Sequence, residues 1–270
     1  LLRFHGHGNN GLQNVTGAVR VGTWKKPPIR VAAGKRAKAS NAEEAVATTE
    51  IRVTKRGSAI DIETILPKPT RTWGLFDWRS RTGAEVTYEI SLPATLATDV
   101  ETVNGRVTAE RRLAPLTLNT VNGSVRVEAH DAPLHVNTVN GSVEVAFAGA
   151  LRTAELETVN GSVTVTCGRD SSFRYDLQTV NGKIRSDFPE VTVEGKWGPK
   201  EARGAVADGR GRLAVETVNG EVRIVAVDPR GGKDRIRQPR HGDLGRIVGK
   251  HQLRPGRTRI GDDVPVDVEP

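Results

Sequence analysis

Three glutamates occupy one position of a repeated phrase, where paired carboxylates could act as acid and base on a sugar. Glu101, Glu157 and Glu216 each stand directly before a Thr-Val-Asn-Gly sequence. Glycoside hydrolysis needs two carboxyl groups about 5 to 9 Å apart, and stacked β-strands repeat at about 4.8 Å. Asn119 and Asn137 hold the same position in the copies between Glu101 and Glu157. We therefore expect these two carboxylates to be too far apart, and the row to be a solvated polar edge.

The other reactive side chains form no recognisable constellation. Cys167 is the only cysteine, so no intrachain disulfide can form, and its place in Val163–Cys167 predicts a solvent-facing or terminal side chain. A thiol nucleophile needs a histidine base nearby, and no sequence feature supplies one. The six histidines, which include His5 and His7, lack zinc-ligand spacing. No glycine-rich phosphate loop opens a helix. We expect no catalytic residue, no metal and no cofactor.

A short aromatic cluster stands apart from any strand or helix pattern. Trp73, Phe76 and Trp78 lie close together in a chain that has only four Trp, two Tyr and five Phe. They could cover an open end of the β body, where apolar side chains need a cap. They could instead form an exposed partner-binding loop that packs on a sugar ring or on another surface.

The elements that would position these side chains are copies of the phrase Thr-Val-Asn-Gly. Successive asparagines of the phrase lie 18, 18, 20, 21 and 38 residues apart, and the last interval is about two periods. Repetition at this period predicts a stacked repeat architecture. We predict structural repeat turns at Asn104, Gly105, Asn122, Gly123, Asn140, Gly141, Asn160, Gly161, Asn181, Gly182, Asn219 and Gly220.

Two β topologies fit the residues that flank the phrase. Apolar and polar residues alternate on both sides, as in Leu134–Thr138 and Val143–Phe147, which predicts strands with one buried face. Asn-Gly tolerates positive φ, as a tight primed turn requires, so each copy could be a hairpin of an antiparallel meander. Near-verbatim recurrence favours a β-solenoid, in which asparagines stack and hydrogen-bond. The long interval before Asn219 would then be a degenerate rung or an excursion.

The repeated phrase resembles the bacterial putative-adhesin family of β-strand repeats, a domain of unknown function also called toastrack. The strand Val86–Pro93 and the closing Glu216–Ile224 fit the resemblance, which covers about residues 12–227. It implies an all-β, single-stranded right-handed parallel β-solenoid, β-helix-like, with coils of roughly 18–21 residues. It also implies export to the bacterial envelope and no established activity.

Composition shifts divide the chain into three parts. We expect a flexible lead over residues 1–11, the β-strand-repeat domain over 12–227, and a mostly disordered, basic Gly/Pro/Arg-rich tail over 228–270. Leu12–Val21 reads as a worn copy of the repeat. Capping-box spacing predicts one short N-terminal helix over about residues 41–48.

Charge and hydropathy narrow the class of partner. Of the net charge of +8, residues 1–42 carry +8 and residues 229–270 carry +4, which leaves −4 on the body. An acidic body argues against a nucleic-acid groove along the repeats. No apolar run reaches the roughly 18 residues of a transmembrane segment. Because Met is absent, we expect a processed form or a fragment.

We therefore predict a non-catalytic cell-envelope scaffold or adhesin-like interaction module. Its expected location is extracytoplasmic, in the periplasm or on the cell surface, and its expected partner is a cell-envelope protein or polysaccharide. Two alternatives remain. One is a carbohydrate-active enzyme on the same β-helix, and the other is an envelope scaffold that self-assembles by end-to-end stacking of coils.

Overall fold

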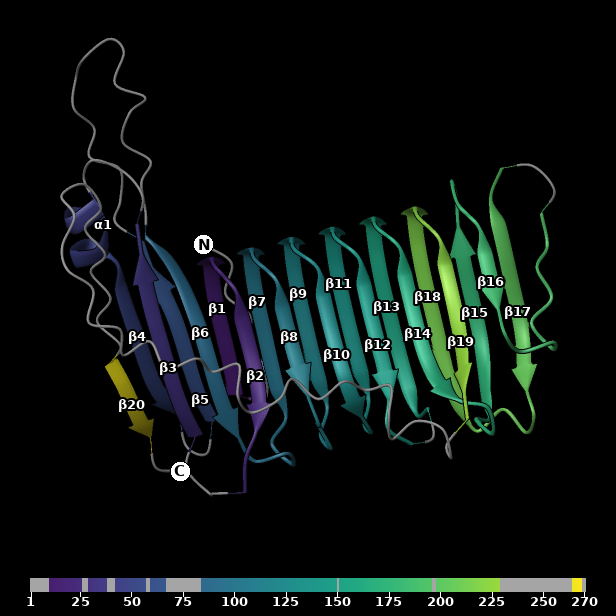
Figure 1. The fold of residues 1–270 in the computed structure, drawn as a ribbon, viewed down its shortest axis with the longest axis horizontal. Helices are drawn as coiled ribbons and strands as arrows, with labels where there is room; N and C mark the ends of the chain where they lie inside the picture. Colours follow the sequence, from purple (N-terminus) through teal and green to yellow (C-terminus); the bar gives the residue numbers. More distant parts are fainter. Residues whose placement is uncertain are drawn as a thin grey trace, which may run out of the picture.

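Two ten-stranded sheets, A and B, make up most of the computed structural model (Figure 1). The structure describes residues 10–25, 29–37, 42–56, 59–66, 84–149, 151–195, 198–228 and 264–268. In spatial order, sheet A contains β17 (Lys200–Val206), β15 (Phe173–Thr179), β18 (Gly211–Asn219), β13 (Thr153–Asn160), β11 (Leu134–Asn140), β9 (Leu116–Asn122), β7 (Thr98–Asn104), β1 (Asn10–Thr16), β5 (Ala59–Ile65) and β4 (Glu50–Arg56). Sheet B contains β16 (Ile184–Ser186), β19 (Val222–Val227), β14 (Val163–Gly168), β12 (Val143–Phe147), β10 (Val125–His130), β8 (Val107–Glu110), β2 (Val19–Thr23), β6 (Glu85–Leu92), β3 (Ile29–Arg36) and β20 (Val264–Val268).

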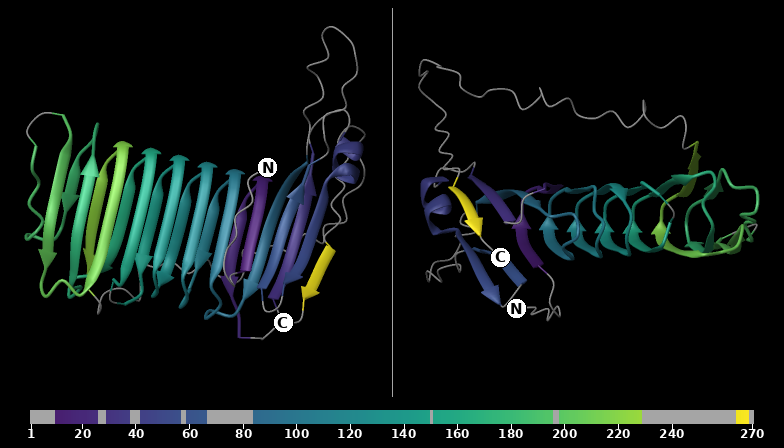
Figure 2. Two further views of the ribbon diagram at one scale, coloured as in Figure 1. Left: turned by 180° about the vertical axis from the view of Figure 1, so that it is seen from behind. Right: turned by 90° about the horizontal axis from the view of Figure 1, so that it is seen from below.

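Each central repeat is one coil that contributes a strand to both sheets. The chain runs along a strand of sheet A, turns at Asn-Gly, runs along a strand of sheet B and returns (Figure 2). Neighbouring coils pair in parallel and in register, so that Thr102 lies beside Thr120 and Thr120 beside Thr138. Equivalent residues therefore stack, and the repeats are coils rather than the hairpins of a meander.

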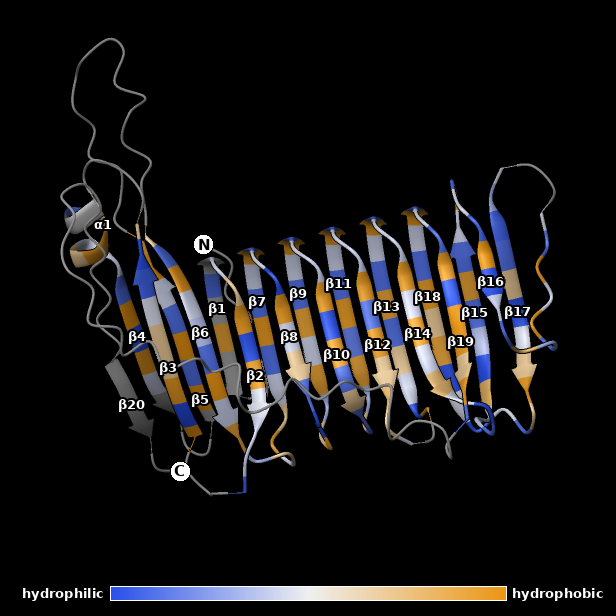
Figure 3. Cartoon of the chain, viewed as in Figure 1, coloured by the Kyte–Doolittle hydropathy of each residue, from blue (hydrophilic) through white to orange (hydrophobic). Residues whose placement is uncertain are grey.

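The core lies between the two sheets and follows from the alternation along each strand. In β11, Leu134, Val136 and Thr138 are buried, whereas His135 and Asn137 point outward. Figure 3 shows the same alternation as hydrophobic and hydrophilic bands across successive strands. Fully burying a Val or Leu side chain contributes about 1.5–3 kcal/mol. One continuous apolar cluster thus joins the coils from end to end.

One coil at each end enters the stack out of sequence order. β18 and β19 lie between β13–β14 and β15–β16, although they follow all four strands in the chain. At the other end, β1 and β2 lie between β5–β6 and β7–β8. The long interval before Asn219 is therefore an excursion through residues 187–210, which include β17. The worn copy Leu12–Val21 is a genuine member of the stack, since β1 pairs with β7 and β2 with β8.

Antiparallel strands close both ends of sheet A and the β20 end of sheet B, whereas β16 at the other end of sheet B pairs in parallel with β19, so both sheets are mixed. β17 pairs antiparallel with β15, β4 with β5, and β3 with both β6 and β20. The predicted short helix is confirmed as α1 (Ala42–Thr48), which lies at the end of the stack where β3 and β4 stand (Figure 1). No helix within the described ranges is long and apolar enough to cross a membrane.

Part of the predicted tail is ordered. β20 lies within residues 228–270 and covers the edge of β3 in sheet B. Residues 229–263 and 269–270, and residues 1–9 of the predicted lead, lie outside the described residues. The three-part division of the chain stays a prediction.

Candidate functional site

The corner where sheet A passes into sheet B, here the TVNG edge, is held by a continuous asparagine ladder. After the first asparagine, each Nδ2 donates to the Oδ1 of the asparagine on the preceding coil of the stack, at 2.7 to 2.9 Å. The ladder runs through Asn104, Asn122, Asn140, Asn160, Asn219 and Asn181. Its order is the spatial order of the strands, because Asn219 stands between Asn160 and Asn181. The ladder expected from the repeat is therefore present and includes the inserted coil.

The glycines of the TVNG edge serve close packing, and the primed-turn interpretation is wrong. The Asn-Gly pairs do lie at the corners, but the described residues with positive φ do not include them. A Cβ on Gly141 would lie 2.0 Å from the carbonyl oxygen of Gly123, and one on Gly220 would lie 1.9 Å from that of Gly161. Such distances are far below van der Waals contact. Glycine is required because equivalent glycines stack against one another's backbone.

The Thr and Val of the phrase have opposite environments. The threonines are buried, and Thr138 Oγ1 donates to the Gly123 carbonyl at 3.2 Å, as Thr217 Oγ1 does to Gly161 at 3.0 Å. The valines face outward and are 38–43% exposed at Val103, Val121, Val139, Val159 and Val180. A row of exposed apolar side chains thus runs beside the asparagine ladder.

The outer face of sheet A carries a shallow acidic hollow of about 130 Å³. It is lined by Glu155, Glu157, Asp176, Gln178, Ala214 and Glu216. Glu157 and Glu216 are register partners on β13 and β18, so one strand spacing of about 4.8 Å separates their positions. Sequence order concealed this pair, because the inserted β18 stands directly beside β13.

Glu101 is too far from Glu157 to pair with it, as predicted, because Asn119 and Asn137 lie between them. Burial raises the pKa of Glu101, and the charge of Asp99 raises it further. Its nearest row partner is the amide residue Asn119 rather than a second acid. The polar row before the threonines is therefore real, but only its C-terminal part brings carboxylates together.

The opposite corner of the coils buries two basic groups that sequence reasoning missed. Arg112 is fully buried and donates to the carbonyls of Pro93, at 2.9 Å, and Leu96, and to Thr98 Oγ1 at 3.1 Å. Burial lowers its pKa to about 10. Burial also lowers the pKa of His130, whose Nδ1 has no hydrogen-bond partner among the residues that the structure describes. These groups are sealed inside the corner and support its loops.

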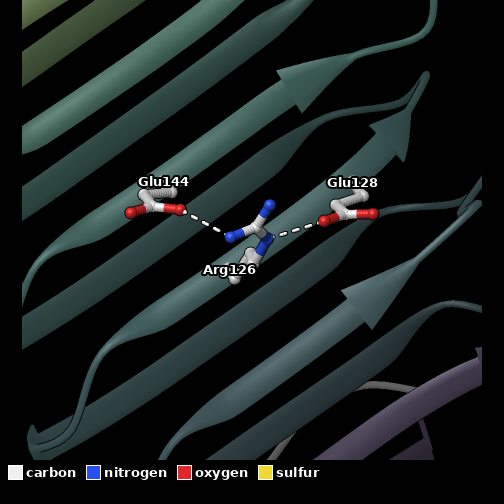
Figure 4. A network of polar contacts seen from close by, with 3 residues as sticks. All are labelled: Arg126, Glu128 and Glu144. Carbon is white, nitrogen blue, oxygen red and sulfur yellow. Dashed lines mark hydrogen bonds and ion pairs between the residues drawn. The ribbon is translucent and has the colours of Figure 1, made fainter. Parts of the chain in front are cut away.

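The outer face of sheet B shows exposed ion pairing both within a strand and between neighbouring strands. Arg126 donates through Nε to Glu128 at 2.6 Å and pairs through a terminal nitrogen with Glu144 at 3.1 Å (Figure 4). Both carboxylates raise the pKa of Arg126, the Glu128 hydrogen bond most strongly. Exposed pairs of this kind contribute about 0.2–1 kcal/mol. This network therefore adds little stability to neighbouring coils.

The prediction that Cys167 is solvent-facing or terminal is wrong, because its side chain is fully buried. It shares strand parity with Val163 and Val165, which point into the core. Burial raises the pKa of its thiol to about 11, so the thiol stays protonated at neutral pH. Over the described part of the chain, no three His, Cys, Asp or Glu side chains form a metal-binding group.

The predicted partner-binding loop of Trp73, Phe76 and Trp78 lies outside the described residues, as do His5 and His7. The residues that sequence reasoning missed at the acidic hollow are Glu155 and Asp176. The alternation of the sequence does indicate that both side chains face outward. It does not indicate that they lie close together, because their proximity depends on the insertion of β18 between β13 and β15.

Comparison with known proteins places the repeats in a family. Residues 95–225 match the model described as Toastrack DUF4097, which confirms the resemblance seen in the repeated phrase. The solved structure of a "putative cell adhesion protein" from Clostridium sporogenes is similar over 82% of this chain and 93% of that chain, with 11% identity and a TM-score of 0.46. No curated protein matches the chain.

Proposed function

We propose that this chain, whose residues 95–225 carry the Toastrack repeats, is a non-catalytic, adhesin-like interaction module of the cell envelope. We place it outside the cytoplasm, as a right-handed coil that presents one long edge to a partner. The observation that carries the proposal is the TVNG edge, where exposed valines repeat beside an unbroken asparagine ladder.

The valine position is informative because it has no evident part in stacking the coils. In most copies the Thr hydroxyl donates to a neighbouring carbonyl, as Thr138 does to Gly123, while Asn extends the ladder and Gly permits backbone contact. Val139 is 38% exposed and Val159 is 40% exposed, yet both keep an apolar side chain. Exposed apolar side chains that lie side by side and are bordered by polar residues are typical of interaction surfaces. This supports recognition of a cell-envelope polysaccharide or protein along the edge.

Binding to isolated cell envelopes of the encoding organism tests the proposal. The purified chain should co-sediment with envelopes, and the double variant Val121→Ser/Val139→Ser should lose most of this binding. A matched control is Val193→Ser/Val227→Ser, because these valines are 38% and 39% exposed but lie off the edge. Melting curves verify that both variants fold. Equal binding by the edge variant and the control would contradict the proposal.

Glycoside hydrolysis is the second candidate, and the Glu157–Glu216 pair favours it. A retaining glycosidase holds its two carboxyl groups about 5–5.5 Å apart, which is close to the spacing of register partners. The hollow is open and shallow, at about 130 Å³, which supports the non-catalytic reading. Release of reducing ends from envelope polysaccharides, lost in Glu157→Gln and in Glu216→Gln, would establish hydrolysis instead.

End-to-end self-assembly has less support. In sheet A, β17 and β4 close the two ends as antiparallel strands, and Glu194 bridges to Glu201 on the outer side of β17. Charged, irregular edges oppose strand addition. Light scattering should show one species over a wide concentration range, and growing particles would favour the self-assembling scaffold.

A further inference from the structure

A second hollow lies on the outer face of sheet A and is basic. Its volume is about 540 Å³, and it opens beside the acidic hollow, over β13, β18 and β15 of the sheet. It is lined by Thr153, Arg174, Asp176, Gly209, Arg210 and Arg212. Asp176 also lines the acidic hollow, so the two depressions adjoin.

Two arginines stand side by side in this hollow. Arg212 on β18 is the register partner of Arg174 on β15, and Thr153 on β13 completes the row. Like charges directly opposite each other destabilise a sheet. Among the described residues, neither guanidinium forms an ion pair with a carboxylate. Asp176 is hydrogen-bonded by Arg203 at 3.1 Å and by Gln178 at 3.1 Å instead.

The other register pair of arginines on an outer face is different. Arg185 and Arg223 are neighbours on β16 and β19 of sheet B, and Glu221 lies 3.5 Å from Arg185. On sheet A, His135 Nδ1 lies 3.4 Å from a carboxylate oxygen of Glu155. Within the described part of the chain, Arg174 and Arg212 are thus a pair of cations with no carboxylate at ion-pair distance, although the charge of Arg212 helps to lower the pKa of the nearby Asp176.

A third cation comes from the loop that leads into β18. Arg210 is held to Asp208 at 2.8 Å, and its backbone N–H donates to Ser172 Oγ at 3.2 Å. Gly209 has a φ of +64°, and a Cβ there would lie 2.9 Å from Arg174 Cγ. The loop thus packs directly against the Arg174 side chain, and Arg210 joins Arg174 and Arg212 in lining the depression.

We propose that this basic hollow binds the oxyanion of an acidic oligosaccharide. Planar guanidinium groups bind carboxylate or sulfate oxygens in pairs of parallel hydrogen bonds. The adjoining Glu155, Glu157 and Glu216 would repel a continuous polyanion but accept hydrogen bonds from hydroxyl or N-acetyl groups. The favoured ligand therefore alternates one anionic sugar with one neutral sugar. This site stands on the outer face of sheet A, so it does not depend on the TVNG edge.

Calorimetric titration of the full chain tests the site with three probes. These are an octasaccharide of alternating glucuronic acid and N-acetylglucosamine, an oligogalacturonate of equal length, and a single-stranded oligonucleotide. The alternating octasaccharide should bind most tightly. Arg174→Gln/Arg212→Gln should lower its affinity by roughly tenfold or more, because two charge-assisted hydrogen-bond sets are lost.

The matched control is Arg223→Gln, which removes an outer-face cation from sheet B and should leave the affinity unchanged. Val121→Ser/Val139→Ser should also leave it unchanged, so this site and the TVNG edge fail or succeed separately. Three results would overturn the inference. They are absence of octasaccharide binding, an equal loss of affinity in Arg223→Gln, and binding of the oligogalacturonate or the oligonucleotide as tightly as the octasaccharide.

Discussion

From β7 to β14 the chain adds one coil after another, so neighbours in sequence are neighbours in the sheets. β18 and β19 instead enter between two coils that precede them in the chain. Both regions nevertheless make the same contacts. Gly141 packs on Gly123 as Gly220 packs on Gly161, and the asparagine ladder passes through both without a break.

The difference between these regions shows that a coil's position depends on its contacts and not on its place in the chain. Each copy offers identical groups to the coil on either side, so an inserted copy fits as well as a sequential one. The cost of the longer connection is modest, because loop-closure entropy grows only slowly with length. Insertion also has a consequence for function, since both hollows on sheet A exist only because β18 lies between β13 and β15.

The largest expected effect is a loss of stability that stays local to the region in which a core leucine is replaced. Leu118 and Leu213 are both fully buried, in β9 and in the inserted β18. Replacing either by Ala should cost about 2–5 kcal/mol. Because each coil contacts only its neighbours, Leu213→Ala should speed hydrogen exchange in β15 to β19 and leave β7 to β10 protected. Leu118→Ala should do the reverse, and uniform deprotection by both would contradict independent opening.

Glycine stacking should be equally strict in both regions. Gly141→Ala and Gly220→Ala each place a Cβ within 2.0 Å of a carbonyl oxygen, and overpacking of this kind costs about 1–3 kcal/mol or more. Thermal unfolding should show lower midpoints for both variants. Gly22→Ala is the control, because the nearest atom there is 3.8 Å away. A similar midpoint for all three would refute the packing role.

The asparagine ladder gives a smaller but more discriminating test. Asn219 both donates to Asn160 and accepts from Asn181, whereas Asn181 stands at the end of the ladder. At about 0.5–1.5 kcal/mol for each hydrogen bond, Asn219→Ala should lose roughly twice the unfolding free energy of Asn181→Ala. If the coils followed sequence order, Asn181 would be interior and the ranking would reverse.

The smallest effect concerns the second corner of the central coils, where His130 is buried near Arg112 and Asp131. The inserted coil has no such buried histidine at this corner, where its described residues end at the exposed Asp228. Burial holds the pKa of His130 below its unfolded value of about 6.5, so protonation favours the unfolded chain. The stabilising contribution is present above that value and is lost as pH falls below it. His130→Leu should therefore flatten the fall in melting temperature between neutral and acidic pH, and an unchanged fall would contradict this role of His130.

Much of the local structure could be predicted from the sequence. Strict alternation around residues such as Val136 and Val143 predicted strands with one buried face, and verbatim recurrence favoured stacked coils over hairpins. The role of the glycines was misjudged, because Asn-Gly has two physical uses and only the neighbouring backbone distinguishes them. Cys167 was misplaced although its parity with Val165 was visible.

The candidate sites could not be predicted, because they depend on long-range order. Arg174 and Arg212, like Glu157 and Glu216, are far apart in sequence and meet only where β18 is inserted. No local pattern encodes which gap in the stack a late coil fills. The position of β18 is therefore the point on which both the fold and the proposed ligand site depend.

Thiol cross-linking tests that position most directly. In a Cys167→Ala background, Glu157→Cys/Glu216→Cys places two thiols on register partners, about 4.8 Å apart. Glu157→Cys/Gln178→Cys places them on strands separated by β18, at about twice that spacing. A short bifunctional thiol reagent should couple the first pair in high yield and the second pair poorly. Efficient coupling of Cys at 157 and 178, with little at 157 and 216, would contradict the insertion.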